Sequence, residues 1–165
     1  MKKIIIAILS VTFLVSCENE GSKDVKLDDN EKVVTSFANG APQIVRELKK
    51  SDTGVESVYE KEYYEDGNIL KEGPIDNNQR HGYWKTYYRN GNLWNEGYYD
   101  HGVRQDSITG YYPDGELKYI GVFDKGQKTG TWLFYDEQGK LKENKVYMKP
   151  GEKRETDIYI PAESK

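Results

Sequence analysis

Residues 84–102 read WKTYYRNGNLWNEGYYDHG, a glycine turn between two segments rich in aromatic residues. Asn90-Gly91 lies between runs in which apolar and polar residues alternate, which is the strongest short-range signal for a β-hairpin. This glycine recurs with a stride of 24 residues, at Gly67, Gly91, Gly115 and Gly139. The sequence therefore predicts a hairpin repeated four times, and we number the units one to four by these turn glycines.

Other positions keep the same stride, so the repeat is more than a periodic glycine. A tyrosine lies four residues before each turn glycine, at Tyr63, Tyr87, Tyr111 and Tyr135. An aliphatic residue follows it by two, at Ile69, Leu93, Leu117 and Leu141. Hydrophobic residues also recur eight positions after it, at Ile75, Tyr99, Phe123 and Tyr147. We expect an all-β fold, an elongated single-layer antiparallel β-meander built from about five 24-residue hairpin repeats.

The turn type sets which side chains share a face of the sheet. We favour a three-residue loop, a type I turn with the glycine in the left-handed position, in which Tyr87 faces Leu93. A two-residue turn would shift the pairing by one residue and exchange the partners. On the other face, the favoured register places six aromatic residues, Trp84, Tyr88, Trp94, Tyr98, Tyr112 and Trp132. They form either a candidate binding surface or ordinary cross-strand packing, and we give both equal weight.

The ends of the array are expected to be atypical, because terminal repeats must cap an open stack. Residues 32–56 resemble a degenerate first hairpin around Asn39-Gly40, with about three extra residues looped out near 50–54. Four regular repeats occupy residues 57–150. Residues 151–165 are expected to form a C-terminal capping strand, near 157–160, and a tail.

The first residues read as a targeting signal. Two lysines precede a 12-residue apolar stretch, which is too short to span a bilayer and is typical of a signal peptide over residues 1–16. Leu14-Val15-Ser16-Cys17 resembles the lipobox of bacterial lipoproteins, which implies lipidation at Cys17; a plain signal peptide with an incidental cysteine is the alternative. Residues 17–31 are polar and acidic, as in a flexible tether. We therefore expect a protein anchored to a membrane of the bacterial cell envelope, with the membrane and leaflet left open.

Composition excludes several functions. The formal charge of −4 offers no basic surface for nucleic acid. One Cys and two His leave little for a metal site, and we expect no metal, no cofactor and no enzymatic activity. His81 and His101 could act as a general base or a metal pair, but we interpret both as residues of the connections between hairpins. Asp66 and Asp114 share a column with Asn90 and Gln138, so this position needs a turn former rather than a charge.

The pattern Trp-x-x-Tyr-Tyr-x-Asn-Gly-x-Leu, followed by Gly-Tyr-Tyr-x-x-Gly, resembles the MORN repeat, especially its bacterial variant form. The resemblance covers residues 57–147, with 84–102 the best match, and departs from the pattern at Asp106 and Asp136. It implies an elongated antiparallel sheet that serves as a scaffold or membrane-associated adaptor for a protein partner. Two alternatives remain: a repeat protein that binds glycan or peptidoglycan through aromatic stacking, and an antitoxin or immunity partner of a toxin.

Overall fold

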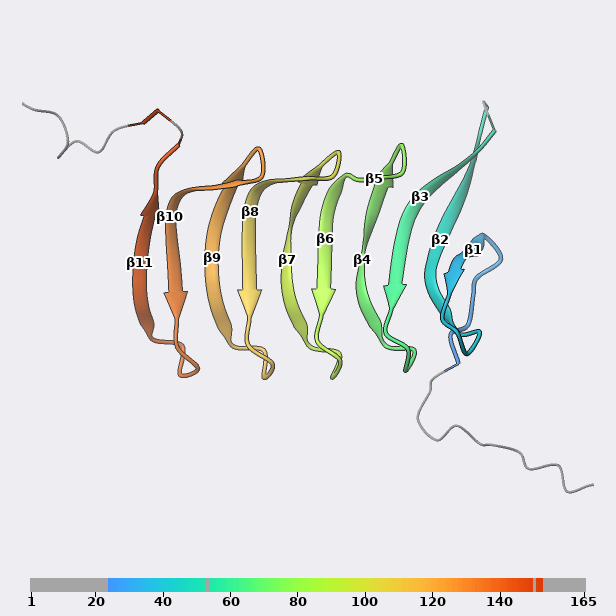
Figure 1. The fold of residues 1–165 in the computed structure, drawn as a ribbon, viewed down its shortest axis with the longest axis horizontal. Helices are drawn as coiled ribbons and strands as arrows, with labels where there is room; N and C mark the ends of the chain where they lie inside the picture. The colour runs from blue at the N-terminus through green and yellow to red at the C-terminus, as the bar shows by residue number, and fades with distance from the viewer. Residues whose placement is uncertain (1–23, 53, 150, 153–165) are drawn as a thin grey trace, which may run out of the picture.

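The structure, a computed structural model, describes residues 24–52, 54–149 and 151–152, and its strands form one open sheet (Figure 1). The strands are β1 (Glu31–Ser36), β2 (Pro42–Ser51), β3 (Gly54–Tyr63), β4 (Ile69–Asp76), β5 (Gln79–Arg80), β6 (Gly82–Tyr87), β7 (Leu93–Asp100), β8 (Val103–Tyr111), β9 (Leu117–Asp124), β10 (Gln127–Tyr135) and β11 (Leu141–Tyr147). Their order in the sheet follows the sequence, and only the short β5 lies off this path, paired with β4. The predicted all-β, single-layer meander is confirmed. None of the residues described forms a helix long and apolar enough to cross a membrane.

Each regular unit closes with the three-residue loop that the sequence favours. In unit two, Tyr87 pairs with Leu93, and the Tyr88 N–H donates to the Asn92 carbonyl at 2.8 Å. The Gly91 N–H donates to the Tyr88 carbonyl at 2.9 Å, with φ of +89° at the glycine. The Asn90 side chain accepts the Asn92 N–H at 3.0 Å, so this column does serve the turn.

The connections between units are two-residue turns. Both central residues of the turn from Asp100 to Val103 have positive φ, +43° at His101 and +86° at Gly102, as a type I′ turn requires. The Gly102 N–H donates to the Arg80 carbonyl of the preceding unit at 2.7 Å. The Gly126 N–H donates in the same way to the Arg104 carbonyl at 2.8 Å. The connecting turns form a row at one end of the strands (Figure 1).

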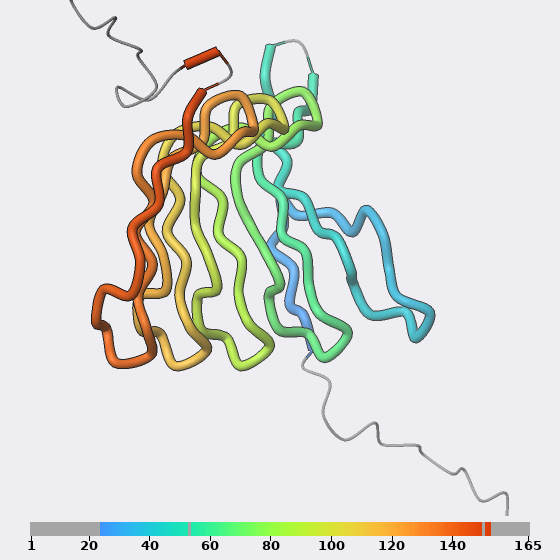
Figure 2. Tube along the Cα trace, turned by 60° about the vertical axis from the view of Figure 1, so that its left-hand side comes forward, coloured from blue at the N-terminus to red at the C-terminus, as the bar shows by residue number. Residues whose placement is uncertain are grey.

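A bulge bends the strands shortly after each connection. It lies at Gly82 and Gly130, with φ of +104° and +65°, and at Asp106, with φ of +59°. Figure 2 shows the connecting ends of the hairpins folded over relative to their long straight segments. Asp106 was recognised in the sequence as a departure from glycine, and it adopts the same left-handed backbone.

Side chains alternate between the two faces of the sheet, and the faces differ. Trp84 pairs with Gly97 on the face that we call the closed face, where Trp84 and Trp132 are 2% exposed and Ile108 is 3% exposed. Tyr83 pairs with Tyr98 on the opposite face, which we call the open face. The large buried side chains of units two to four, Trp84, Ile108 and Trp132, therefore lie on the closed face.

The ends of the array differ in part from the prediction. β1 and β2 confirm the first hairpin, but β1 begins at Glu31, within the expected tether. The extra residues near 50–54 do not loop out, because β2 and β3 are longer than the equivalent strands β7 and β8 and their pairing continues to Ser51 and Gly54. The signal peptide, Cys17 and the expected strand at 157–160 lie outside the described residues.

Candidate functional site

The two buried tryptophans join neighbouring units. The Trp84 ring lies against Gly73, where a Cβ would overlap it, and its Nε1–H donates to the Pro74 carbonyl at 2.8 Å. Trp132 repeats the arrangement against Gly121, with a 3.2 Å bond to the Val122 carbonyl. For both residues the sequence left a contact surface and ordinary packing open with equal weight, and the structure shows packing, because the bend and the glycine column enclose their rings.

A row of cations lies across the aromatic side chains of the closed face. The Arg80 guanidinium lies 4.5 Å from the Trp84 ring centroid and 5.4 Å from that of Tyr99. Arg104 lies between Tyr99 and Phe123, at 5.3 and 5.5 Å, and Lys128 continues the row over Trp132 at 4.2 Å. These cations were not among the candidates predicted from the sequence, although Arg80, Arg104 and Lys128 keep the stride of the repeat.

A second row consists of tyrosine hydroxyls that bond to the next unit. The Tyr88 hydroxyl donates to the Tyr111 carbonyl at 2.8 Å, and the Tyr112 hydroxyl donates to the Tyr135 carbonyl at 2.9 Å. Tyr64 makes the same bond one unit earlier, at 2.9 Å to Tyr87. Tyr88 and Tyr112, two further residues of the predicted surface, thus link adjacent units.

The remaining two aromatic candidates are more accessible but lie apart. Trp94 is 43% exposed and packs against Tyr88, with ring centroids 5.9 Å apart. Tyr98 lies on the open face beside Tyr83, 6.4 Å between centroids. The six candidates therefore do not share one face, since Tyr98 is on the side opposite Trp84.

The open face instead exposes aliphatic side chains that the sequence analysis did not select. Ile120 and Val122 of β9 are 37% and 40% exposed, and Val146 of β11 is 58% exposed. Half-buried Leu133 of β10 pairs with Ile120 and connects the two strands. We call Ile120, Val122, Leu133 and Val146 the apolar strip; their period-two alternation with closed-face residues was the available signal.

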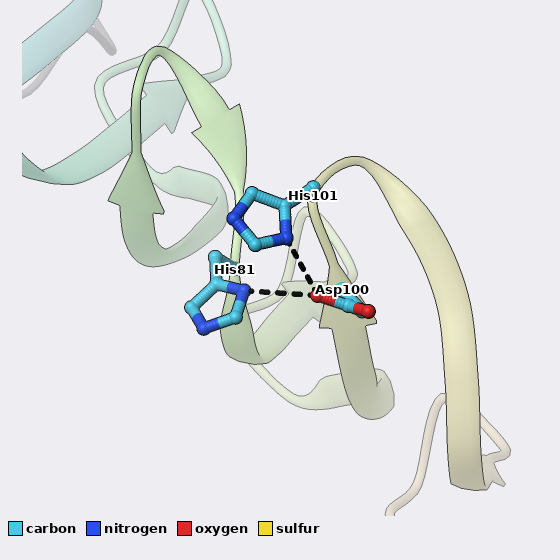
Figure 3. Close-up of side chains that lie close together, drawn as sticks. All are labelled: His81, Asp100 and His101. Atoms are coloured by element: carbon cyan, nitrogen blue, oxygen red, sulfur yellow. Dashed lines mark hydrogen bonds and ion pairs between the residues drawn. The ribbon is translucent and has the colours of Figure 1, made fainter.

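Both histidines lie beside the turn that follows β7 (Figure 3). His81 Nδ1 and His101 Nδ1 lie 3.3 and 2.7 Å from the same Asp100 oxygen, and the two ring centroids are 4.5 Å apart. The Asp76 carboxylate lies 3.1 Å from His101 Nε2. Hydrogen bonds with Asp100 and Asp76 raise the pKa of His101. From the sequence the two histidines were interpreted as separate residues of the connections between hairpins, whereas the structure brings them together.

Comparison with known families agrees with this geometry. The profile of the MORN repeat variant matches residues 58–77, 80–101 and 128–148. The chain is a MORN repeat variant protein. Unit three lies outside the matched residues, yet it forms the same hairpin in this MORN array, with Asp106 and Ile108 where the neighbouring units have glycine and tryptophan. The array is thus a repeat module of the kind that serves protein or membrane interaction.

Comparisons with individual proteins add little to the family assignment. No curated protein matches the chain. A similar solved structure is the crystal structure of a TarM mutant from S. aureus in complex with fondaparinux, alpha-GlcNAc-glycerol and UDP. The identity is 9% and the TM-score 0.41, and the match covers 67% of this chain but only 21% of TarM, so the MORN chain spans about a fifth of that protein.

Proposed function

We propose that this chain is a non-enzymatic MORN module, anchored by a lipid on Cys17 in the bacterial cell envelope, that binds a protein partner through the apolar strip. The supporting observation is that one face of the sheet is closed by its own aromatic and cationic side chains while the other leaves aliphatic side chains exposed. Isolated exposed apolar residues are common, but a contiguous set on one face is typical of an interaction surface.

The surroundings of the strip resemble those of a protein interface. Polar side chains border it: Thr109 pairs with Ile120, Ser107 with Val122 and Thr131 with Val146. An apolar centre with a polar rim is the usual anatomy of such contacts. The strip extends over β9, β10 and β11, so a partner can contact three neighbouring strands at once.

Substitution of a strip residue tests the partner contact. In cells that express the chain naturally, we expect chemical crosslinking to give a discrete adduct that Val122→Glu removes. Val55→Glu is the matched control, since Val55 is 61% exposed on β3, outside the strip, and this variant should keep the adduct. Loss of the adduct in both variants, or in neither, would contradict the proposal.

The anchor is tested independently. Residues 17–30 limit the distance between a lipid on Cys17 and the start of β1 to about 50 Å, because an extended chain advances about 3.5 Å per residue. We expect Cys17→Ser to move the chain from the membrane fraction to the soluble fraction. If the variant sedimented with membranes as the wild type does, the lipid would not be the anchor.

Glycan binding is the second candidate, favoured by the exposed Trp94 ring beside Tyr88. Since Trp84 and Trp132 are buried, a stacked sugar should perturb the emission of Trp94 alone. Cell-wall fragments should then change the fluorescence of the wild type but not of Trp94→Phe. An unchanged wild-type spectrum at millimolar fragment would remove this candidate.

A further inference from the structure

We propose that His81, Asp100 and His101 form a binding site for one divalent transition-metal ion, with Zn²⁺ as the reference ion. The site joins units one and two at their connecting turns. It is independent of the apolar strip, which lies on β9 to β11.

The geometry places three ligand atoms around one point. One ring nitrogen of His81, one ring nitrogen of His101 and a carboxylate oxygen of Asp100 all lie within 4.8 Å of one another. Zinc–ligand bonds of about 2.0–2.2 Å in a tetrahedral site separate ligand atoms by about 3.4 Å. The 3.3 Å separation of His81 Nδ1 from Asp100 Oδ1 already meets this spacing, whereas His101 Nδ1, 2.7 Å from the same oxygen, would move outward by about 0.7 Å to reach it.

The hydrogen bonds around His101 leave its Nδ1 directed at the carboxylate. When a neutral His101 ring donates its Nε2–H to Asp76, 3.1 Å away, its Nδ1 lone pair lies 2.7 Å from the Asp100 oxygen. Two lone pairs at this distance repel unless a proton or a metal cation lies between them. A carboxylate on the outer nitrogen is also the usual partner of a metal-bound histidine.

The environment of His81 also supports a metal ion at this site. Its Nδ1 is shielded from solvent and has no hydrogen-bond partner among the described residues, although it faces the Asp100 oxygen at 3.3 Å. A buried polar atom without a hydrogen bond is costly, and a metal ion would satisfy it. One cation can therefore serve both imidazoles and the carboxylate.

The donor set indicates the class of ion. Two imidazole nitrogens and one carboxylate oxygen suit Zn²⁺, Ni²⁺ or Cu²⁺, whereas Mg²⁺ and Ca²⁺ prefer oxygen ligands. Three protein ligands leave a further position for water or a group from a partner. The ligand side chains are 38% to 57% exposed, so the ion can enter from solvent.

Comparison with the equivalent turn one stride later separates the residues common to the repeat from those found at this turn. Asp124 occupies the position of Asp100 one stride later, but Gln105 and Lys125 stand in place of the two histidines. The carboxylate thus belongs to the repeat, and the histidines are specific to this turn. The substitutions His81→Gln and His101→Lys introduce residues that an equivalent turn already accommodates.

Equilibrium dialysis of the purified full-length chain against ZnCl₂, after treatment with a chelator, tests the site. At pH 7.5 we expect one bound Zn²⁺ per chain, with affinity at least tenfold lower in His81→Gln and in His101→Lys. Asp124→Asn is the matched control and should bind as the wild type does. Affinity should fall at pH 6, because protons compete for the ring nitrogens.

Histidine ¹⁵N resonances provide a second readout on the wild type, which does not depend on any variant folding. One equivalent of Zn²⁺ should shift Nδ1 of both rings. Absence of bound Zn²⁺, unchanged affinity in His101→Lys, or a shift at only one ring would overturn the proposal; the first outcome would mean that a proton alone joins His101 to Asp100.

Discussion

Gly73, Gly97 and Gly121 are needed for the space that they leave rather than for their backbone freedom. Trp84 and Trp132 occupy the space of a Cβ at Gly73 and Gly121, whereas the smaller Ile108 lies against Gly97. Lys145 stands in this column in the last unit, where no further described strand brings a ring against it. Glycine therefore occupies this position only in units against which a side chain of the following unit packs.

Adding one methyl group to this column tests the packing. Gly121→Ala should lower the free energy of unfolding by about 1–3 kcal/mol, because the methyl overlaps the enclosed Trp132 ring. Gly97→Ala should cost less, since a Cβ there meets Ile108 Cγ1 at 3.4 Å and the Ser107 carbonyl at 3.2 Å. Urea denaturation of both variants measures the difference, and equal costs would refute this explanation.

The left-handed residue at the bulge offers a stabilising substitution. Asp106 has φ of +59°, which a residue with a Cβ adopts at a cost, so Asp106→Gly should raise the free energy of unfolding by up to about 1 kcal/mol. The reciprocal change Gly130→Ala should lower it by about 1 kcal/mol through the backbone alone, since no atom lies within 4 Å of the added Cβ. Thermal unfolding in which both variants shift in the same direction would contradict this account.

For individual residues, the sequence predicted the turns but not the burial of Trp84 and Trp132. A turn depends on a few neighbouring residues, so Asn90-Gly91 was sufficient. Burial depends on the bend at the bulges and on the preceding strand, which the alternation of a single strand does not reveal. The pairing of His81 with His101 was missed for the same reason, because it needs the fold of the connecting turn.

Hairpins are joined by side chains as well as by strand pairing. The hydroxyls of Tyr64, Tyr88 and Tyr112 each bond to a carbonyl of the following unit. Asp136 replaces tyrosine in the last unit, and there it accepts the Gln138 and Lys140 N–H groups of its own turn. This departure from the repeat, which the sequence showed, is thus explained by the position of the unit at the end.

Removal of one hydroxyl measures such a link. Tyr88→Phe should lower the free energy of unfolding by about 1 kcal/mol, because it loses a hydrogen bond to the half-buried Tyr111 carbonyl. Tyr83→Phe is the control; Tyr83 is 52% exposed and its 3.4 Å contact with Ser107 is long. Denaturant titrations measure the free energy of unfolding of both variants. Equal losses would show that the Tyr88 hydroxyl does not stabilise the contact between units.

The first hairpin is held to β3 by an ion pair that depends on pH. Lys61 Nζ lies 2.8 Å from Glu31, whose side chain is 5% exposed. Burial alone would raise the pKa of Glu31, but bonds from Lys61 and the Asp28 amide outweigh it and lower the pKa below its ordinary value of 4.5. A depressed carboxyl pKa stabilises the fold above the unfolded value, and this contribution is lost as pH falls through the folded value.

Amide exchange along β1 therefore should become faster as the solution is acidified below pH 4.5, after correction for intrinsic rates. In Glu31→Gln this acid-dependent part should be absent, while exchange at neutral pH is already faster than in the wild type. An identical pH profile in the two chains would show that the pair does not hold β1 in place.

Across the whole molecule, the stride of the repeat was enough to predict the sheet, its order and the loop register. It was not enough to predict which face is closed, because Arg80, Arg104 and Lys128 act only after the bend brings them over the rings. The polar segment before Glu31 was predicted as tether, but the Leu48 N–H donates to Asn30 and fixes its last residues to β2. Local alternation therefore predicts strands, while the asymmetry of the sheet arises from contacts between units.

The most direct test of the account uses β11, where four consecutive residues are exposed but alternate between the faces. Asn144 and Val146 lie on the open face, and Glu143 and Lys145 lie on the closed face. A photo-crosslinking amino acid placed at each position in turn should give an adduct with the protein partner from 144 and 146 only. Adducts from 143 and 145 in equal yield, or from those two alone, would contradict the claim that the open face binds the partner.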